Sequence, residues 1–164
     1  MAIIKRAHHH DEVMIEWLYL KKIKQLEKKH IEQWKPQDVL WETLSKTYTI
    51  DQFYIVYEDD EITPIGAFVI TDYDPEFWQQ DPPKAALYIH KVMVLDVAEK
   101  RGISDQILTF FKKEGRERGY DVVKLDVREY KDKLRRFYER NGFQLKEKVD
   151  LGKGYLTCLY EYRL

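Results

Sequence analysis

The stretch from Leu87 to Phe143 constrains the fold most, because strand and helix patterns alternate in it around glycine turns. An apolar strand pattern ending in Val92–Val94 leads into a basic turn, Lys100–Ser104, which opens an amphipathic helix. A second strand pattern, Val122–Val127, is followed by a second helix that stops at Asn141–Gly142. A glycine turn between a strand and a helix can bind phosphate, since several N–H groups and the helix dipole point at one anion there. Taken alone, such a turn is more often an exposed loop.

Hairpin patterns flank this central stretch on both sides, and two helix patterns precede it. With 164 residues the chain is long enough for one hydrophobic core, so we expect residues 1–164 to form a single domain. The further elements expected are a strand at Ala2–Arg6, helices at Val13–Lys29 and Pro36–Lys46, strands at Gln52–Tyr57 and Pro64–Tyr73, a long loop at Asp74–Lys84, and strands at Phe143–Val149 and Tyr155–Tyr162.

The charge balance argues against functions that depend on strong electrostatics. The 28 basic and 29 acidic residues give a net charge of −1, which favours neither nucleic acid nor a membrane surface as a partner. The lysines of segment 21–29 are expected to form a solvated helix face, and nucleic-acid contact is not expected from them because Glu27 and Glu32 interrupt them. No apolar run could span a membrane, and a single cysteine, Cys158, fits a reducing compartment, so we expect a cytoplasmic protein. No metal is expected, because the consecutive histidines His8–His10 cannot all converge on one ion from an extended chain.

A second motif, Phe137-Tyr138-Glu139-Arg140-Asn141-Gly142-Phe143, follows the glycine turn at the distance that one helix, one strand and one loop require. With it, the chain resembles the GCN5-related N-acetyltransferase (GNAT) family, whose phosphate turn reads Gln/Arg-x-x-Gly-x-Gly/Ala. Glu99–Ser104 falls on that turn and matches it strictly at Gly102. The resemblance implies an α/β (α+β) fold with a mixed, mostly antiparallel sheet of about seven strands, flanked by about four helices and splayed between its central strands.

The resemblance also implies a site for acetyl-CoA as the co-substrate. The diphosphate would bind the N–H groups of the turn, where Lys100 and Arg101 add positive charge and Glu99 opposes it. The pantetheine arm would pair with the strand end at Val92–Val94, whose N–H groups could also stabilise an oxyanion. The implied cofactor-binding residues are Val92, Met93, Val94, Glu99, Lys100, Arg101, Gly102, Ile103, Ser104, Lys131 and Tyr138.

Acetyl transfer to an amine needs a proton acceptor, because an alkyl amine is almost entirely protonated at neutral pH. His90 is the first candidate, since imidazole titrates in the useful range, and strand alternation places it on one face with Tyr88, Val92 and Val94. A structural histidine, with a water chain carrying the proton, is an equal alternative. Asp126, near the end of the neighbouring strand, is the second candidate base.

The acceptor is expected to contact the two N-terminal helices and the loop Asp72–Asp81. The acidic and aromatic side chains of this loop suit a cationic amine. Tyr73 and Trp78 of this loop, with Tyr88 and His90 of the central strand, are the candidate substrate-binding residues. The alternative is a solvated loop with one aromatic residue in the core. A small amine is expected because no extended peptide groove is indicated, whereas the identity of the amine and the oligomeric state, including a homodimer, stay open.

The reaction implied by the resemblance is N-acetyl transfer from acetyl-CoA to a primary amine, by direct attack in a ternary complex. Tyr138 stands at the family position of the acid that protonates the leaving thiolate, although its spacing alone indicates a core residue. Glu99, Ser104 and Lys131 depart from the family pattern, with Lys131 standing where asparagine is usual. The alternative function is therefore a GNAT-fold module that binds acyl-CoA or a partner without turnover.

Overall fold

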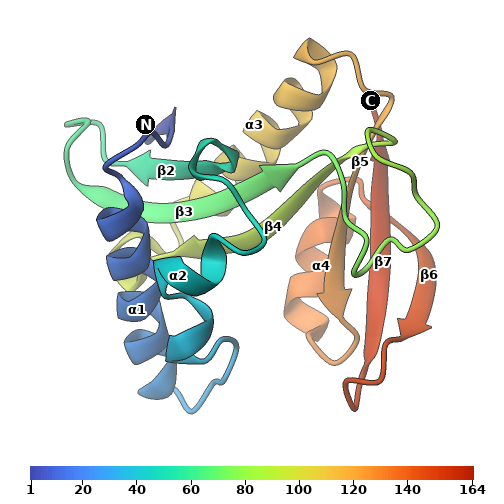
Figure 1. The fold of residues 1–164 in the computed structure, drawn as a ribbon, viewed down its shortest axis with the longest axis horizontal. Helices are drawn as coiled ribbons and strands as arrows, with labels where there is room; N and C mark the ends of the chain where they lie inside the picture. The colour runs from blue at the N-terminus through green and yellow to red at the C-terminus, as the bar shows by residue number, and fades with distance from the viewer. The chain divides into compact units, whose positions relative to one another are not determined.

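The computed structural model describes residues 1–164, whose strands form a seven-stranded sheet in the order β1-β2-β3-β4-β5-β7-β6 (Figure 1). The β1–β2, β2–β3, β5–β7 and β6–β7 pairs are antiparallel, and the β4–β5 pair is parallel. The β4–β5 ladder covers two register pairs, Leu87 with Val123 and Tyr88 with Lys124, as expected for a sheet that splays between its central strands. The predicted mixed α/β fold is confirmed. The strands are β1 Ile3–Arg6, β2 Phe53–Tyr57, β3 Pro64–Thr71, β4 Leu87–Val94, β5 Val122–Arg128, β6 Gln144–Asp150 and β7 Leu156–Arg163.

Four α-helices and three short 3-10 turns connect these strands. Gly119 follows the end of helix α3 as its predicted terminator, with a left-handed φ of 82° and an N–H that donates to the carbonyl oxygen of Arg116. None of the helices combines the length and the apolar character that crossing a membrane requires. The helical segments are α1 Glu12–Glu27, η1 Pro36–Asp38, α2 Trp41–Leu44, η2 Ile50–Gln52, η3 Asp96–Ala98, α3 Ile103–Glu117 and α4 Asp132–Arg140.

The chain divides into two compact units, and β3, β4 and α3 each continue from one unit into the other. The first unit comprises Met1–Val69 and Lys91–Gln106, and the second comprises Ile70–His90 and Ile107–Leu164. The prediction that residues 1–164 form a single domain stays a prediction.

The core of the first unit lies between α1 and one face of its strands. Side chains of alternate strand positions, Phe53 and Ile55 of β2 and Ala67 and Val69 of β3, are all fully or almost fully buried in this core. Helix α2 lies beside α1 (Figure 1), and the Trp41 N–H donates to a Glu16 carboxylate oxygen at 2.8 Å. The helices contribute Ile15, Leu18, Tyr19, Ile23 and Leu44 to the same core.

The single helix predicted for Pro36–Lys46 is wrong, because the chain forms two separate turns there. Pro36 opens a three-residue 3-10 turn, and Leu40 then adopts an extended backbone with φ −66° and ψ 143° before α2 begins. The interruption places Val39 and Leu44 in the core together, with Val39 completely buried. The chain therefore buries Val39 with two short helical turns instead of forming one continuous helix over this segment.

A left-handed residue interrupts β4 at its centre. Lys91 has a φ of 52°, a conformation that costs a non-glycine residue about 1–2 kcal/mol. Its carbonyl oxygen accepts a hydrogen bond from the Tyr19 hydroxyl at 2.7 Å, and its ammonium group lies 5.6 Å from the centre of the Trp34 ring. One left-handed residue can disturb the alternation of a strand, so the prediction that Val92 and Val94 share the face of His90 stays a prediction.

Strand β5 of the second unit has two different faces. Helix α3 packs on one of them so closely that a Cβ on Gly115 would lie 2.7 Å from Val123 Cγ1.

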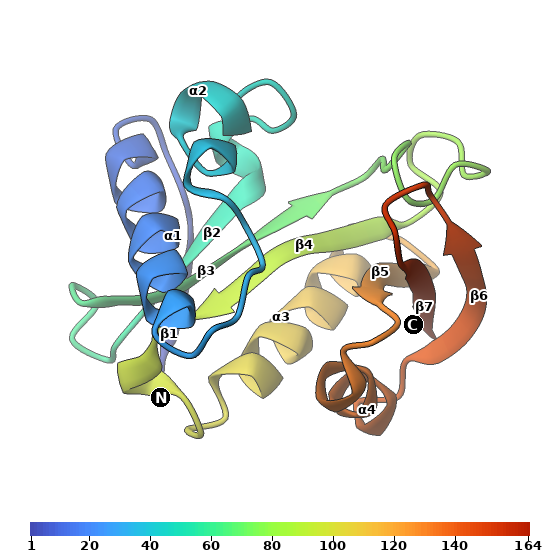
Figure 2. The same cartoon turned by 90° about the horizontal axis from the view of Figure 1, so that it is seen from below.

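Helices α3 and α4 lie next to each other (Figure 2), and Lys112 Nζ donates to the Asn141 carbonyl oxygen at 2.6 Å. The loop between β3 and β4 covers other strand residues, with Trp78 packed in a buried cluster that includes Tyr88, Val122 and Leu159.

Candidate active site

The glycine turn before α3 has the backbone that phosphate binding requires. Lys100 and Gly102 both adopt left-handed conformations, with φ of 60° and 76°. A Cβ added to Gly102 would meet nothing within 4 Å, so the space over the turn is open. The first main-chain hydrogen bond into α3 runs from the Gln106 N–H to the Gly102 carbonyl oxygen, and the N–H groups of Ile103 and Ser104 precede it. The turn therefore fits an anion such as the diphosphate of CoA.

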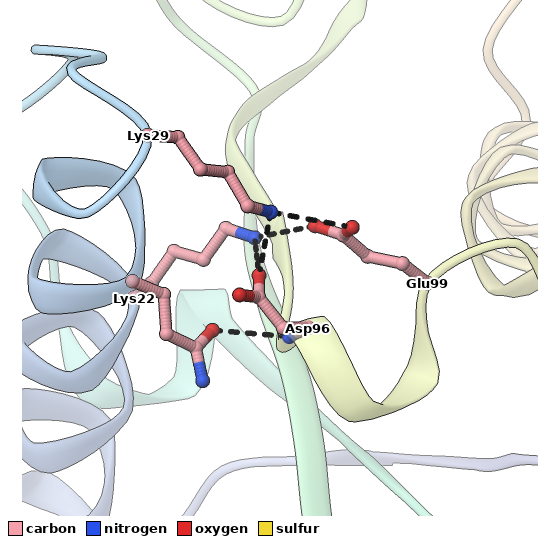
Figure 3. A network of polar contacts seen from close by, with 5 residues as sticks. Lys22, Lys29, Asp96 and Glu99 are labelled. Carbon is pink, nitrogen blue, oxygen red and sulfur yellow. Dashed lines mark hydrogen bonds and ion pairs between the residues drawn. The ribbon is translucent and has the colours of Figure 1, made fainter.

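A four-residue ion-pair network, Lys22, Lys29, Asp96 and Glu99, holds the segment before this turn (Figure 3). The Lys22 ammonium lies 3.2 Å from Asp96 Oδ1 and 3.0 Å from Glu99 Oε1, and Figure 3 shows it reaching from α1 between the two carboxylates. Lys29 lies 3.2 Å from Asp96 and 3.6 Å from Glu99. Two of the lysines predicted to be solvated are therefore paired, and Lys22 is buried. Glu99, expected to repel the diphosphate, has its charge offset by two cations.

Replacing Lys22 by methionine should destabilise the first unit by about 1–2 kcal/mol, because Asp96 and Glu99 keep only Lys29 and solvent as partners. Acetyl-CoA should bind about three- to tenfold more weakly, since one cation instead of two then offsets the Glu99 charge beside the turn. Urea unfolding and calorimetric titration measure the two effects. Lys24→Met is the matched control, because Lys24 lies exposed on the same helix. Equal losses in both variants would contradict a specific contribution of the network.

Other residues predicted to touch CoA already have partners within the protein. The Arg101 guanidinium binds the Glu58 carboxylate in a two-pronged contact, at 3.0 and 2.6 Å. The Lys131 ammonium lies 5.7 Å from the centre of the exposed Tyr130 ring, directly before α4. Two of the five donors of Arg101 are thus already used by Glu58.

The second unit brings the predicted base candidates His90 and Asp126 together with a third residue, Asp74. A potential ligand atom from each of these side chains lies within 4.8 Å of the other two. His90 Nε2 lies 3.0 Å from the Thr71 hydroxyl, which also donates to the Tyr73 carbonyl oxygen. A hydroxyl has one proton, so Thr71 can donate to only one of these two groups, and the direction of the His90 contact follows the tautomer of the imidazole. Sequence reasoning placed Asp74 only in an acidic loop.

Both carboxylates of this cluster hold their protons more tightly than ordinary aspartates do. Burial raises the pKa of Asp126 to about 7, and the charges of Asp74 and Glu76 add to the effect. Burial likewise raises the pKa of Asp74 to about 6, although the hydrogen bond from the Phe77 N–H opposes the shift. Groups that titrate near neutral pH can exchange protons with a substrate under working conditions.

Asp74→Asn should stabilise the protein above about pH 6 by as much as about 3 kcal/mol, because it removes a buried carboxylate with a pKa raised from 3.8 to about 6. Wild-type folding takes up a proton between these two values, so wild-type stability falls as the pH rises through them. The advantage of the variant should vanish below about pH 4, where both side chains are neutral. Thermal unfolding across the pH range measures this, and an equal difference at every pH would contradict it.

Tyr138, the predicted acid, lies in α4 and is buried beside Phe137 and Phe143, with ring centres 5.3 and 6.0 Å away. Burial and the charge of Asp126 raise the pKa of its phenol, so the hydroxyl keeps its proton throughout the neutral range. A protonated phenol can donate to a thiolate.

The predicted acceptor residues form a different arrangement from the one expected. Trp78 and Tyr88 are buried, and the Lys124 ammonium lies 4.3 Å from the centre of the Trp78 ring and 2.7 Å from Asp81 Oδ2. The Tyr88 hydroxyl donates to the same Asp81 oxygen at 2.6 Å. Tyr73 is exposed. The acidic and aromatic loop thus already binds one primary ammonium group, supplied by the chain itself.

The family model for the acetyltransferase (GNAT) family matches residues 14–143. The chain belongs to the GNAT family. This match includes the glycine turn and the Asp74–His90–Asp126 cluster, and it confirms the resemblance seen in the sequence. Members of the GNAT family use acetyl-CoA as the co-substrate.

Solved GNAT structures share the fold at low sequence identity. A GNAT acetyltransferase from Listeria monocytogenes superposes with a TM-score of 0.80 at 22% identity, covering 99% of this chain and 95% of that one. Ard1 from Thermoplasma volcanium gives 0.69 at 15% identity, covering 99% and 97%. N-acetylglutamate synthase from Neisseria gonorrhoeae, solved with coenzyme A and N-acetyl-glutamate, gives 0.66 at 17% identity and covers all of this chain but 35% of its own. No curated protein matches the chain in sequence.

Proposed function

We propose that this GNAT protein transfers the acetyl group of acetyl-CoA to a primary amine of a small molecule, by direct attack in a ternary complex. The observation that carries the proposal is the Asp74–His90–Asp126 cluster, where two carboxylates with raised pKa values lie beside an imidazole. Such a cluster can take the proton that an alkylammonium must lose before its nitrogen becomes a nucleophile.

The acetyl-CoA contacts belong to the same proposal. The N–H groups at the Lys100–Ser104 turn would bind the diphosphate, and those of Val92, Met93 and Val94 would pair with the pantetheine arm and polarise the thioester carbonyl. Tyr138 would protonate the leaving thiolate; its raised pKa keeps the hydroxyl protonated beforehand but also makes the phenol a weaker acid. His90 is the first candidate for the proton acceptor and Asp126 the second. The single cysteine, Cys158, supports a cytoplasmic setting for this reaction.

The alternative, a GNAT-fold module that binds acyl-CoA without turnover, was motivated by the three departures from the family motif. Pairing of Glu99 with Lys22 and Lys29 weakens one of those grounds, because the carboxylate no longer acts as an isolated negative charge. Ser104 and Lys131 remain as departures.

A test of the proposed function incubates the protein with acetyl-CoA and a panel of small primary amines, and follows free thiol release with a coloured disulfide reagent. Amine-dependent thiol release, together with an acetylated product identified by mass spectrometry, is the expected result. Tight acetyl-CoA binding without amine-dependent release from any member of the panel would favour the non-catalytic alternative.

A further inference from the structure

Asp74 has an unpartnered carboxylate oxygen. The residue is 4% exposed, and its Oδ1 accepts the Phe77 N–H at 3.1 Å. Its Oδ2 is buried and has no hydrogen-bond partner. A buried carboxylate oxygen without a donor is costly, so this atom is suited to receive a donor from a ligand.

The spacing of the three side chains indicates what kind of ligand they would hold. Acceptors that each lie about 2.8 Å from a tetrahedral ammonium nitrogen are about 4.6 Å apart. Adjacent ligands of a divalent metal at about 2.1 Å are about 3.0–3.4 Å apart, and ligands on opposite sides of an octahedral ion are about 4.2 Å apart. The atoms of Asp74, His90 and Asp126 lie within 4.8 Å of one another, a spacing that accommodates an ammonium group.

The neighbouring residues show that this loop can hold such a group. Lys124 places a primary ammonium between the Asp81 carboxylate and the Trp78 ring. Lys153, the other lysine near the loop, pairs with Glu76 at 2.8 Å. Asp74 and Asp126 form no ion pair within 4 Å, although the charge of Lys153 acts on Asp126. Together the two carboxylates carry up to two negative charges, so the cluster is electrostatically suited to a cation from outside.

We propose that Asp74, His90 and Asp126 bind the acceptor of the reaction as a primary alkylammonium ion, and that Asp74 determines the selection for this charge. The inference rests on the proposed function and names the substrate class more narrowly. Each of the three N–H bonds of the ammonium meets one side chain of the cluster. One N–H bond then breaks, its proton passes to the His90–Asp126 pair, and its electron pair stays on the nitrogen as the nucleophile. Tetramethylammonium, which has no N–H bond, and planar guanidinium do not satisfy this geometry.

The test titrates ethylammonium chloride into the protein without acetyl-CoA and follows the His90 imidazole resonances by NMR at constant ionic strength. The expected result is a saturable shift that tetramethylammonium chloride does not produce. Asp74→Asn should weaken ethylammonium binding at least about tenfold, because its Oδ1 keeps the Phe77 contact while Oδ2 is replaced by a donor. Glu147→Gln is the matched control, since it removes an exposed carboxylate of β6 that does not shift the pKa of Asp74 or Asp126, and it should change binding by less than about twofold.

Three results would overturn the proposal: equal responses to ethylammonium and tetramethylammonium, an unchanged affinity in Asp74→Asn, or tight Zn²⁺ binding that requires all three side chains and excludes ethylammonium. Acetyl-CoA binding, measured on the same samples, separates this inference from the proposed function. Asp74→Asn should bind acetyl-CoA as the wild type does. Ethylammonium binding by a protein that does not bind acetyl-CoA would contradict the proposed function alone.

Discussion

Replacing Asp126 by asparagine is expected to lower kcat/KM for acetyl transfer by about 10²- to 10⁴-fold, the usual contribution of general acid–base catalysis. Asparagine keeps the shape of the side chain but accepts no proton at neutral pH. The native carboxyl group can do so because burial and the Asp74 charge raise its pKa to about 7. Acetyl-CoA affinity should stay within about twofold of the wild type, since the predicted CoA contacts do not include Asp126.

The dependence of kcat/KM on pH tests the same role of the cluster as a proton acceptor. Wild-type kcat/KM should fall as the pH drops below about 7, because a protonated cluster cannot accept the proton of the amine. The inflection belongs to the coupled cluster rather than to one residue, and it should move in both Asp126→Asn and His90→Gln. Glu129→Gln removes a carboxylate that is paired with Lys148 and should leave the profile unchanged. An Asp126→Asn enzyme with wild-type rate and profile would exclude Asp126 as a proton acceptor.

Tyr138→Phe is expected to lower kcat by about 10²-fold while the dissociation constant of acetyl-CoA changes little. The phenyl ring keeps the contacts with Phe137 and Phe143, so folding stability should be nearly unchanged. The lost hydroxyl is the proton donor for the leaving thiolate, and its raised pKa keeps it protonated in the native enzyme. Single-turnover kinetics with saturating acetyl-CoA measure the effect on the chemical step.

Tyr162→Phe provides a matched control for Tyr138→Phe. Tyr162 lies in the same aromatic cluster, with its ring centre 5.6 Å from that of Phe143, and its ring packs under the Lys112 ammonium at 4.0 Å. Removal of this second phenol hydroxyl should leave kcat within about twofold of the wild type. Two results would show that Tyr138 is a packing residue and does not donate a proton to the thiolate. They are equal decreases of kcat in the two variants, or a Tyr138→Phe effect on KM for acetyl-CoA alone.

Local patterns in the sequence predicted the elements whose order the fold depends on. The β2–β3 hairpin, the strand, turn and helix around Gly102, and the closing β6–β7 hairpin all follow from alternation, helical periodicity and glycine positions. The prediction of one helix over Pro36–Lys46 was wrong, because the burial of Val39 outweighs the tendency of that segment to form a single helix. Helix propensity predicts the extent of a helix poorly where tertiary packing decides which residue is buried.

The site was less accessible to sequence reasoning because its contacts join residues distant in the chain. Helical spacing put Lys22 on a polar face, and nothing local shows that Asp96 and Glu99, more than seventy positions away, pair with it. Strand alternation could not foresee the left-handed backbone of Lys91, which the Tyr19 hydroxyl stabilises from α1. Of the cluster, His90 and Asp126 could be found from the strands that carry them, whereas Asp74 comes from a loop without periodicity.

The most direct test of the account is the melting temperature of the protein with and without a large excess of acetyl-CoA. At about 100 times the dissociation constant, binding adds about 2.7 kcal/mol, which predicts a rise of about 5–11 °C for a domain of this size. ATP at equal concentration and ionic strength controls for a general effect of a nucleotide polyanion and should raise the melting temperature far less. No rise with acetyl-CoA, in a protein that unfolds cooperatively, would contradict the assignment of the glycine turn as a CoA site and with it the proposed acetyl transfer.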